Sequence, residues 1–209
     1  MVFVHLIYDL TALYGVVPWG SAPGFLILKN WGGTVFFLLS GLCATLGSRE
    51  LKRGCLVFGC GMLVSAVTGI FSPGTPIRFG VLHCLGLCML LWHLLKRLPS
   101  PISAPAGAGI ILLGFFFEKR RVCWGWLYPL GLTTPDFYSA DYFPLIPYLG
   151  YFLLGAVLGR RLYSPRRSLL PRVDTHNLMI RFLLLCGRHS LIIYLAHQPV
   201  LMAVSEILF

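Results

Sequence analysis

Two ionisable residues near the start of the chain have the spacing of a general base and its partner. His5 and Asp9 lie four residues apart in an apolar stretch, so a helix places both on one face. A carboxylate beside an imidazole fixes the ring tautomer and raises its basicity, as a general base requires. Alternatively, both lie near a water-exposed helix end, where solvent or each other satisfies them. We expect a functional role, because ionisable groups are costly in apolar sequence.

A second polar group lies in the apolar stretch 187–201, which contains Arg188, Ser190, Tyr194 and His197. Ser190, Tyr194 and His197 follow one another at i, i+4 and i+7, so they share one face of a helix. An ionisable side chain at mid-bilayer costs roughly 2.5–3.5 kcal/mol on insertion scales, so such groups usually face the protein interior. The sequence therefore predicts a polar wall inside a helix bundle.

Two further candidates are single residues with structural alternatives. His83 lies between Gly80 and Gly86, and it is either functional or part of a close helix contact that the glycines allow. Asp141 precedes a predicted helix over 143–160. There it either caps that helix, with Pro144 in the first turn, or contacts a substrate.

Arg160 and Arg161 begin a basic segment that follows the same predicted helix. Guanidinium groups bind phosphate strongly, so this pair is a candidate site for a nucleotide-like cofactor. The simpler alternative is the excess of basic residues that cytoplasmic loops of membrane proteins carry.

Composition places these residues in a membrane protein. Of the 209 residues, 57% are hydrophobic and only 11% are charged, whereas soluble domains carry about 25% charged residues. The net charge of +10 is distributed between apolar spans, and no nucleic-acid-binding module is evident. Cys84 and Cys88 share a helix face, but no matching Cys or His pair accompanies them. We therefore expect packing there and no metal.

The hydropathy pattern predicts an all-α, polytopic bundle of about seven transmembrane helices in one domain spanning 1–209. A helix needs about 20 apolar residues to cross the hydrocarbon core, so two of the seven are short. Trp124, Trp126 and Tyr128 are typical of an interfacial segment. The predicted helices cover residues 1–17, 33–47, 54–71, 77–95, 104–118, 143–160 and 180–208.

The basic connections predict the orientation. Clusters at 49–53, 96–97 and 160–172 alternate with less basic connections, so the positive-inside rule puts these clusters and the N-terminus in the cytoplasm. The run 119–121 is the exception, because it falls on the opposite side.

Several motifs together resemble the bacterial branch of the heparan-α-glucosaminide N-acetyltransferase catalytic-domain family, which belongs to a wider set of glycan-modifying membrane acyltransferases. Each motif is weak alone, but they occur in the family's order over nearly the whole chain. They are residues 1–9 (MVFVHLIYD), 36–41 (FFLLSG), 79–83 (FGVLH), 141–147 (DYFPLIP), and 187–191 (GRHSL) through 197–199 (HQP).

The resemblance implies acyl transfer across a membrane, with acetyl-CoA held from the cytoplasmic side. The acceptor would be a sugar amine or hydroxyl of an envelope glycan at the bacterial inner membrane. Such chemistry needs a base that deprotonates the acceptor, and hydrogen-bond donors that stabilise the oxyanion of the tetrahedral intermediate. The resemblance implies that His197, His5 and His83 are catalytic residues, with Asp9 orienting His5. Arg188, Ser190 and Tyr194 would donate hydrogen bonds to the oxyanion. Asp141 would bind the acceptor, and Arg160 and Arg161 would bind acetyl-CoA.

Two departures from the family's pattern modify these expectations. Family members usually carry an Asp-x-x-Arg-Gly motif before the position of Met1, so we expect a truncated first helix or an earlier start. Lysosomal members are similar to an enzyme that uses a histidine after its first helix, and the stretch 24–34 contains none. Heparan specificity is therefore not expected.

Two other functions remain open from the sequence. Intramembrane His and Asp are also typical of a proton-coupled transporter or flippase for a polar or lipid-linked solute, although no internal repeat is visible. The other alternative is a non-catalytic subunit or an inactive, truncated paralogue. The sequence also leaves a homodimer open.

Overall fold

The computed structural model describes residues 23–71, 74, 76–163 and 177–208. The regular secondary structure within these ranges is helical, with isolated β-bridges and no strand, so the expected all-α class is confirmed. The chain divides into two compact units. The first unit comprises Thr34–Leu169. The second includes the helices after residue 177 and also the stretch Pro23–Gly33, so the first described helix begins in the second unit and ends in the first. The organisation as a single functional domain stays a prediction.

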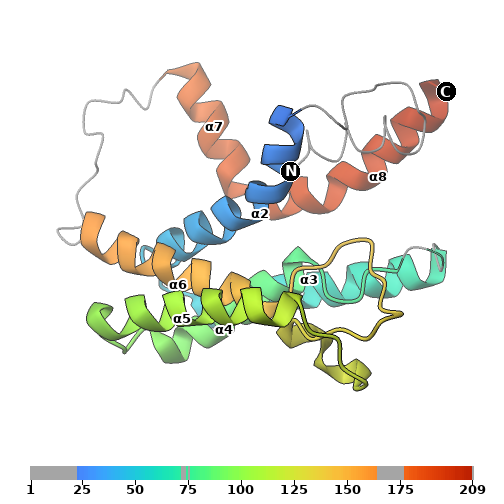
Figure 1. Ribbon diagram of the computed structural model, residues 1–209. Helices are drawn as coiled ribbons and strands as arrows, with labels where there is room; N and C mark the ends of the chain where they lie inside the picture. The colour runs from blue at the N-terminus through green and yellow to red at the C-terminus, as the bar shows by residue number, and fades with distance from the viewer. Residues whose placement is uncertain (1–22, 72–73, 75, 164–176, 209) are drawn as a thin grey trace. The chain divides into compact units, whose positions relative to one another are not determined.

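The helices of the first unit are drawn from blue to orange in Figure 1. A short 3₁₀ helix, η3, lies in the long connection between the last two of them. In chain order the elements are α2 (Pro23–Ala44), α3 (Glu50–Phe71), α4 (Val81–Leu95), α5 (Ser100–Glu118), η3 (Gly125–Leu130) and α6 (Leu145–Leu162), followed by α7 (Leu178–Arg188) and α8 (Ser190–Leu208).

Among the described residues, three helices are long and apolar enough to cross a membrane, namely α3, α5 and α6. The pair α7 and α8 would be a fourth span if it crosses as one broken helix, and α4 is a shorter apolar helix. Seven spans are therefore not confirmed, and the first predicted helix, over 1–17, lies outside the described residues.

Four predicted helices are confirmed with shifted ends. The ranges predicted as 54–71, 77–95, 104–118 and 143–160 correspond to α3, α4, α5 and α6. The proline-rich start of α5 places Pro101 in the first turn, where the missing N–H has no helical partner to lose.

The predicted start of the second helix at residue 33 was wrong, because α2 already begins at Pro23. The polar residues Lys29 and Asn30 and the Gly32-Gly33 pair lie within α2 and interrupt its apolar pattern. In apolar surroundings, however, every backbone group needs an internal partner, so glycines are tolerated inside long helices. Pro23 is suited to the first helical position.

The prediction of one helix over 180–208 was also wrong. The chain forms α7 and α8, which are bent by 73° at a break around His189. His189 has φ −103° and ψ 17°, outside the helical values, and it follows Gly187, a poor helix former. The break lies in the polar run Gly187-Arg188-His189-Ser190, which the prediction had included in one continuous helix.

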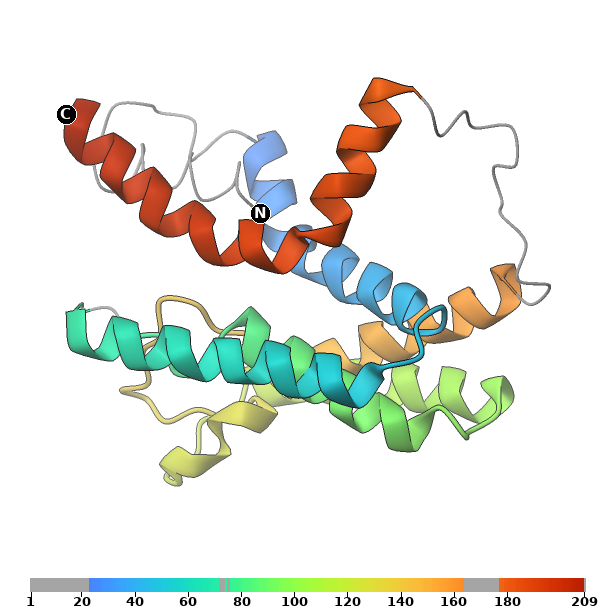
Figure 2. The ribbon, with the colours of Figure 1, turned by 180° about the vertical axis from the view of Figure 1, so that it is seen from behind.

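The first unit is built from two helix pairs. Helix α3 packs along α4, helix α5 packs along α6, and α4 also contacts α6; Figure 2 shows α3 and α4 side by side from behind. Phe37, Cys84, Cys88 and Phe152 are fully buried in this unit. The two cysteines therefore pack in the core, as expected.

Glycines bring α6 into backbone contact with two neighbours. A Cβ on Gly155 would overlap the carbonyl of Leu38 in α2, and a Cβ on Gly41 would overlap the carbonyl of Phe152 in α6. On another side of α6, a Cβ on Gly150 would lie 2.6 Å from the carbonyl oxygen of Gly107 in α5. Small residues are the usual means by which membrane helices approach this closely.

We expect Gly155→Ala to destabilise the protein by about 1–3 kcal/mol, because α2 and α6 must move apart to accept the methyl group. The matched control is Gly59→Ala in α3, where nothing lies within 4 Å of the added Cβ. That change should be neutral or stabilising by roughly 0.5–1 kcal/mol. Thermal unfolding in detergent measures both variants, and equal melting temperatures would contradict the packing account.

Candidate functional site

Two connections meet at one end of the first unit. The segment that enters α4 runs beside the segment that precedes α6, with an isolated parallel bridge between Phe79 and Tyr142. The amide of Phe143 donates to the carbonyl of Phe79 at 3.0 Å, and the amide of Ala140 donates to that of Pro76 at 3.1 Å. These bonds place Asp141 directly at the start of α4.

Asp141 caps α4 rather than α6. Its Oδ2 accepts the Val81 N–H at 2.9 Å, so it satisfies a backbone donor that the first turn leaves unpaired. Helix α6 instead begins after Pro144, which is its N-cap residue. The prediction that Asp141 caps the helix over 143–160 was therefore wrong. Burial raises the pKa of the Asp141 carboxyl, and the Val81 N–H partly opposes this.

His83 lies in the same first turn of α4 and is only 3% exposed. Its Nδ1 accepts the Gly80 N–H at 3.3 Å, so the proton of the neutral ring is on Nε2. Nε2 lies 3.4 Å from Oγ of Ser65, and Ser65 donates in turn to the carbonyl of Ile77. These contacts connect α3 to the turn that begins α4.

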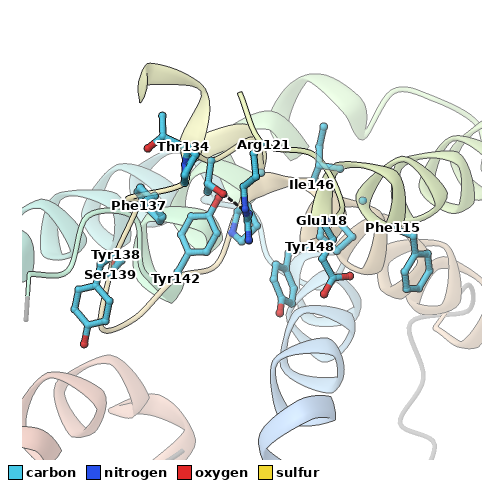
Figure 3. A pocket seen from close by; sticks show the side chains of 16 residues that line it. Phe115, Glu118, Arg121, Thr134, Phe137, Tyr138, Ser139, Tyr142, Ile146 and Tyr148 are labelled. Atoms are coloured by element: carbon cyan, nitrogen blue, oxygen red, sulfur yellow. Dashed lines mark hydrogen bonds between the residues drawn. The ribbon is translucent and has the colours of Figure 1, made fainter. Parts of the chain in front are cut away.

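A cavity of about 500 Å³ adjoins this end of the unit (Figure 3). Its volume is within the range of small-molecule sites, roughly 300–1,000 Å³. The wall combines the end of α5, the connection after η3 and the start of α6. Its polar and aromatic side chains are Phe115, Glu118, Arg121, Thr133, Thr134, Phe137, Tyr138, Ser139, Tyr142 and Tyr148.

Two opposite charges line the cavity without pairing to each other. Among the described residues no ion pair joins Glu118 to Arg121. Arg121 donates to Oγ1 of Thr133 at 2.6 Å and lies beside the Tyr142 ring, and the Glu118 carboxylate lies near Tyr148 (Figure 3).

Aromatic packing stiffens one wall of the cavity. The rings of Tyr128 and Phe137 are stacked at 5.4 Å, and Phe137 lies 4.9 Å from Tyr142. The Tyr142 hydroxyl donates to the carbonyl of Tyr128 at 2.7 Å. Burial raises the pKa of the Tyr142 phenol, so this group stays protonated and remains a hydrogen-bond donor.

The opposite end of the helices carries a second set of basic residues. Arg160 donates to the carbonyls of Leu98, at 2.6 Å, and Lys96, and its guanidinium lies 4.8 Å from the Trp92 ring centre. Lys96 forms an ion pair with Glu50 at 3.2 Å. Arg160 therefore closes the short turn between α4 and α5, while the side chain of Arg161 is exposed.

The second unit places Ser190, Tyr194 and His197 on one helix, α8. His197 is 8% exposed and its Nδ1 is bonded to the carbonyl oxygen of Tyr194. The rings of Tyr194 and His197 lie 5.2 Å apart. Arg188 is exposed at the end of α7 and so belongs to a different helix, while Ser190 is exposed at the start of α8.

The sequence model of a family described as "Heparan-alpha-glucosaminide N-acetyltransferase, catalytic" matches residues 1–199. The chain belongs to this family. The resemblance inferred from the motifs is thereby confirmed, and membership indicates a membrane acetyltransferase with, in general, an acetyl-CoA donor. No curated protein and no solved structure matches the chain.

The predicted site residues of this acetyltransferase family member fall into separate groups. His83 and Asp141 come together at the start of α4, Tyr194 and His197 come together on α8, and Arg160 and Arg161 lie at the basic end of the first unit. His5 and Asp9 lie outside the described residues. In the part of the chain that is described, no three His, Cys, Asp or Glu side chains are grouped as metal ligands. All the catalytic roles stay predictions.

Sequence reasoning missed the cavity residues Glu118, Arg121 and Tyr148 of this family member. One sequence feature pointed to this region: the basic run Lys119–Arg121 is an exception to the positive-inside rule. Tyr142 and Tyr148 lie within or beside the motif 141–147, but a motif does not show which side chains line a cavity.

We expect Asp141→Ala to lower the free energy of unfolding by about 1 kcal/mol, because the Val81 N–H loses its partner. Asp141→Asn keeps an oxygen at this position and should retain most of the stability. Chemical unfolding in mixed micelles measures both variants. Equal losses for Ala and Asn would show that the charge matters rather than the cap.

We expect Arg160→Ala to cost about 2 kcal/mol, because the carbonyls of Lys96 and Leu98 lose a charged donor. Arg161→Ala is the matched control, since the neighbouring arginine is exposed, and its effect on stability should be near zero. Thermal unfolding of the two variants tests this. A larger loss for Arg161→Ala would refute the structural assignment of Arg160.

Proposed function

We propose that this chain transfers an acetyl group from acetyl-CoA to a sugar amine or hydroxyl of an envelope glycan. The observation that carries the proposal is the family match over residues 1–199, which covers nearly the whole chain. The donor would bind from the cytoplasmic side of a bacterial inner membrane and the acceptor from the other side. This arrangement includes about seven spans, with the N-terminus in the cytoplasm.

The distribution of charge in the first unit supports a two-sided arrangement. Arg160, Lys96 and Glu50 are connected at one end of the helices, and the cavity lies at the end where α4 begins and α5 stops. The basic end is the one that the positive-inside rule assigns to the cytoplasm. Arg161, exposed there, is the residue we assign to the phosphates of acetyl-CoA.

The chemistry requires removal of a proton from the acceptor. The acceptor nitrogen or oxygen forms a bond to the acetyl carbonyl carbon, the thioester C–S bond breaks, and CoA leaves as a thiol after taking up the proton. His197 is our first candidate for the base. Its Nδ1–H donates to the Tyr194 carbonyl, so the unprotonated nitrogen of the neutral ring is Nε2.

The remaining assignments follow from the family resemblance. His5, oriented by Asp9, is a second candidate base, and His83 is a third candidate catalytic histidine. Asp141 is assigned to the acceptor. Arg188, Ser190 and Tyr194 are assigned as hydrogen-bond donors to the oxyanion, a type of contact whose loss typically slows acyl transfer about 10²–10³-fold.

The test is transfer of labelled acetyl from acetyl-CoA to added amino sugars and glycans by the purified protein. We expect saturable acetyl-CoA binding and acceptor-dependent loss of label from CoA. His197→Ala should lower the transfer rate by at least about 100-fold, as expected for removal of a general base, while acetyl-CoA binding persists.

His189→Ala is the matched control, because it removes a neighbouring exposed histidine and should leave transfer unchanged. A folded protein that neither binds acetyl-CoA nor transfers label would refute the acetyltransferase. Proton-coupled solute uptake by proteoliposomes in that case would support the transporter instead.

A further inference from the structure

Two opposite charges at the end of α5 face the same cavity. Glu118 is the last residue of α5 and Arg121 follows in the next connection; both line the cavity and both are exposed. Among the described residues, the Glu118 carboxylate forms neither a hydrogen bond nor an ion pair. We propose that this cavity binds the headgroup of a membrane phospholipid that carries both a phosphate and a primary ammonium, namely phosphoethanolamine.

The cavity lies where an apolar helix reaches the depth of the lipid headgroups. In the described part of the chain, α5 is one of three helices long and apolar enough to cross a membrane, and the cavity is at its C-terminal end. Trp124 and Trp126 follow α5 and are 65% and 72% exposed. Tryptophan is enriched at membrane–water interfaces, because its ring is apolar and its N–H is polar. The two charges are therefore at the level where phospholipid headgroups are found.

Arg121 is held in place to receive the phosphate. An isolated bridge pairs it with Thr133, and the amide of Val122 donates to the carbonyl of Thr133 at 3.1 Å. One guanidinium N–H donates to Oγ1 of Thr133 at 2.6 Å, which leaves other N–H groups for a ligand. Guanidinium groups bind phosphate oxygens in strong, charge-assisted hydrogen bonds. In the view of Figure 3, Tyr148 lies between Arg121 and Glu118, so its hydroxyl is a further donor to the ligand.

Glu118 selects a primary ammonium beside that phosphate. A carboxylate offers only acceptors, and a primary ammonium offers three donors. A quaternary ammonium has no N–H and is instead bound by several aromatic faces. The Phe137 ring, which could form part of such a cage, already packs against Tyr128 and Arg78. The cavity therefore favours phosphoethanolamine over phosphocholine.

The helix surface beside the cavity suits the acyl chains of the same lipid. Phe115 lines the cavity, lies three residues before Glu118 and is 58% exposed. Leu112 lies three residues earlier still and is 69% exposed. Residues at this spacing are neighbours on a helix surface, so an apolar track runs from the cavity back along α5 toward the hydrocarbon core. A lipid contacts both the cavity and this track, whereas a soluble headgroup contacts the cavity alone.

Ligands with a single kind of charge fit the cavity less well. An anionic headgroup or a free phosphate would meet the Glu118 carboxylate, and a simple cation would meet Arg121. A ligand that carries both charges and is neutral as a whole satisfies the two side chains together. The lipid would be a bound component of the membrane protein, and its binding does not rest on the proposed acetyl transfer.

The first experiment measures lipid binding to the delipidated full chain in a maltoside detergent, without acetyl-CoA. Native mass spectrometry resolves the protein with and without bound lipid. Phosphatidylethanolamine, phosphatidylcholine and phosphatidylglycerol with identical acyl chains are titrated separately. We expect phosphatidylethanolamine to bind with a Kd at least about tenfold lower than the other two, because only its headgroup forms charge-assisted hydrogen bonds with both side chains. Soluble glycerophosphoethanolamine should not displace it at the concentration at which the lipid binds.

Variants then locate the binding site. Glu118→Gln should raise the Kd for phosphatidylethanolamine by about tenfold. It should also strengthen binding of phosphatidylglycerol, because the carboxylate no longer repels the anionic headgroup. A purely structural role of Glu118 would weaken both lipids alike. The carboxylate has no hydrogen-bond partner among the described residues, so this variant should unfold at the temperature of the unchanged protein.

Two arginine variants complete the set. Arg121→Gln should weaken all three lipids by about tenfold, because each of them carries a phosphate. Arg120→Gln is the matched control. The Arg120 guanidinium lies 4.7 Å from the centre of the Phe116 ring, and this residue does not line the cavity. Its replacement should leave the three affinities unchanged.

The outcomes decide the inference independently of the proposed function. A preference for phosphatidylethanolamine that Glu118→Gln abolishes and Arg120→Gln keeps supports the site. Equal binding of the three lipids overturns it, as does a preference that persists in folded Glu118→Gln or that Arg120→Gln also abolishes. Displacement by glycerophosphoethanolamine at the concentration of lipid binding overturns the lipid in favour of a soluble ligand. Because acetyl-CoA is absent, a protein without acetyltransferase activity would still give the supporting result.

Discussion

Helix α6 approaches α2 and α5 through glycines on two of its sides, and the rest of the first unit is arranged around these contacts. In lipid, apolar side chains gain little from leaving one apolar environment for another, so close backbone packing has to hold the helices together. Gly155 and Gly41 bring α6 to α2, and Gly150 brings it to α5. The packed helices thereby hold the cavity at one end of the unit and the turn bound by Arg160 at the other end.

Polar groups at both ends complete backbone bonds that the helices themselves cannot make. At the cavity end Asp141 receives the first N–H of α4, and His83 receives the N–H of Gly80. At the basic end Arg160 donates to the carbonyls of two residues that follow α4. The same residue types that serve chemistry in an active site thus also hold a helix in place, and the partners of each side chain distinguish the two uses.

Hydropathy located α3, α4, α5 and α6 because long apolar runs have few alternatives in a membrane protein. Hydropathy could not predict the contacts between helices, since Gly41 and Gly155 are far apart in sequence. Asp141 was correctly identified as a cap but assigned to the wrong helix, because the chain stays extended up to Pro144. The break at His189 lies in the polar run 187–190, which the prediction treated as part of one helix. Glu118 and Arg121 have no distinctive spacing, so only the folded chain brings them to one cavity.

The two connections on either side of α5 differ in how much change in length they can accept. Leu95 and Ser100 end and begin adjacent helices, and Arg160 holds the carbonyls between them, so an inserted residue would pull those carbonyls from their donor. The connection from residue 119 to 144 is much longer and includes η3. Loops of this kind tolerate insertion while the scaffold is kept. Differences in length among relatives would therefore accumulate after α5, and the turn before it would keep its length.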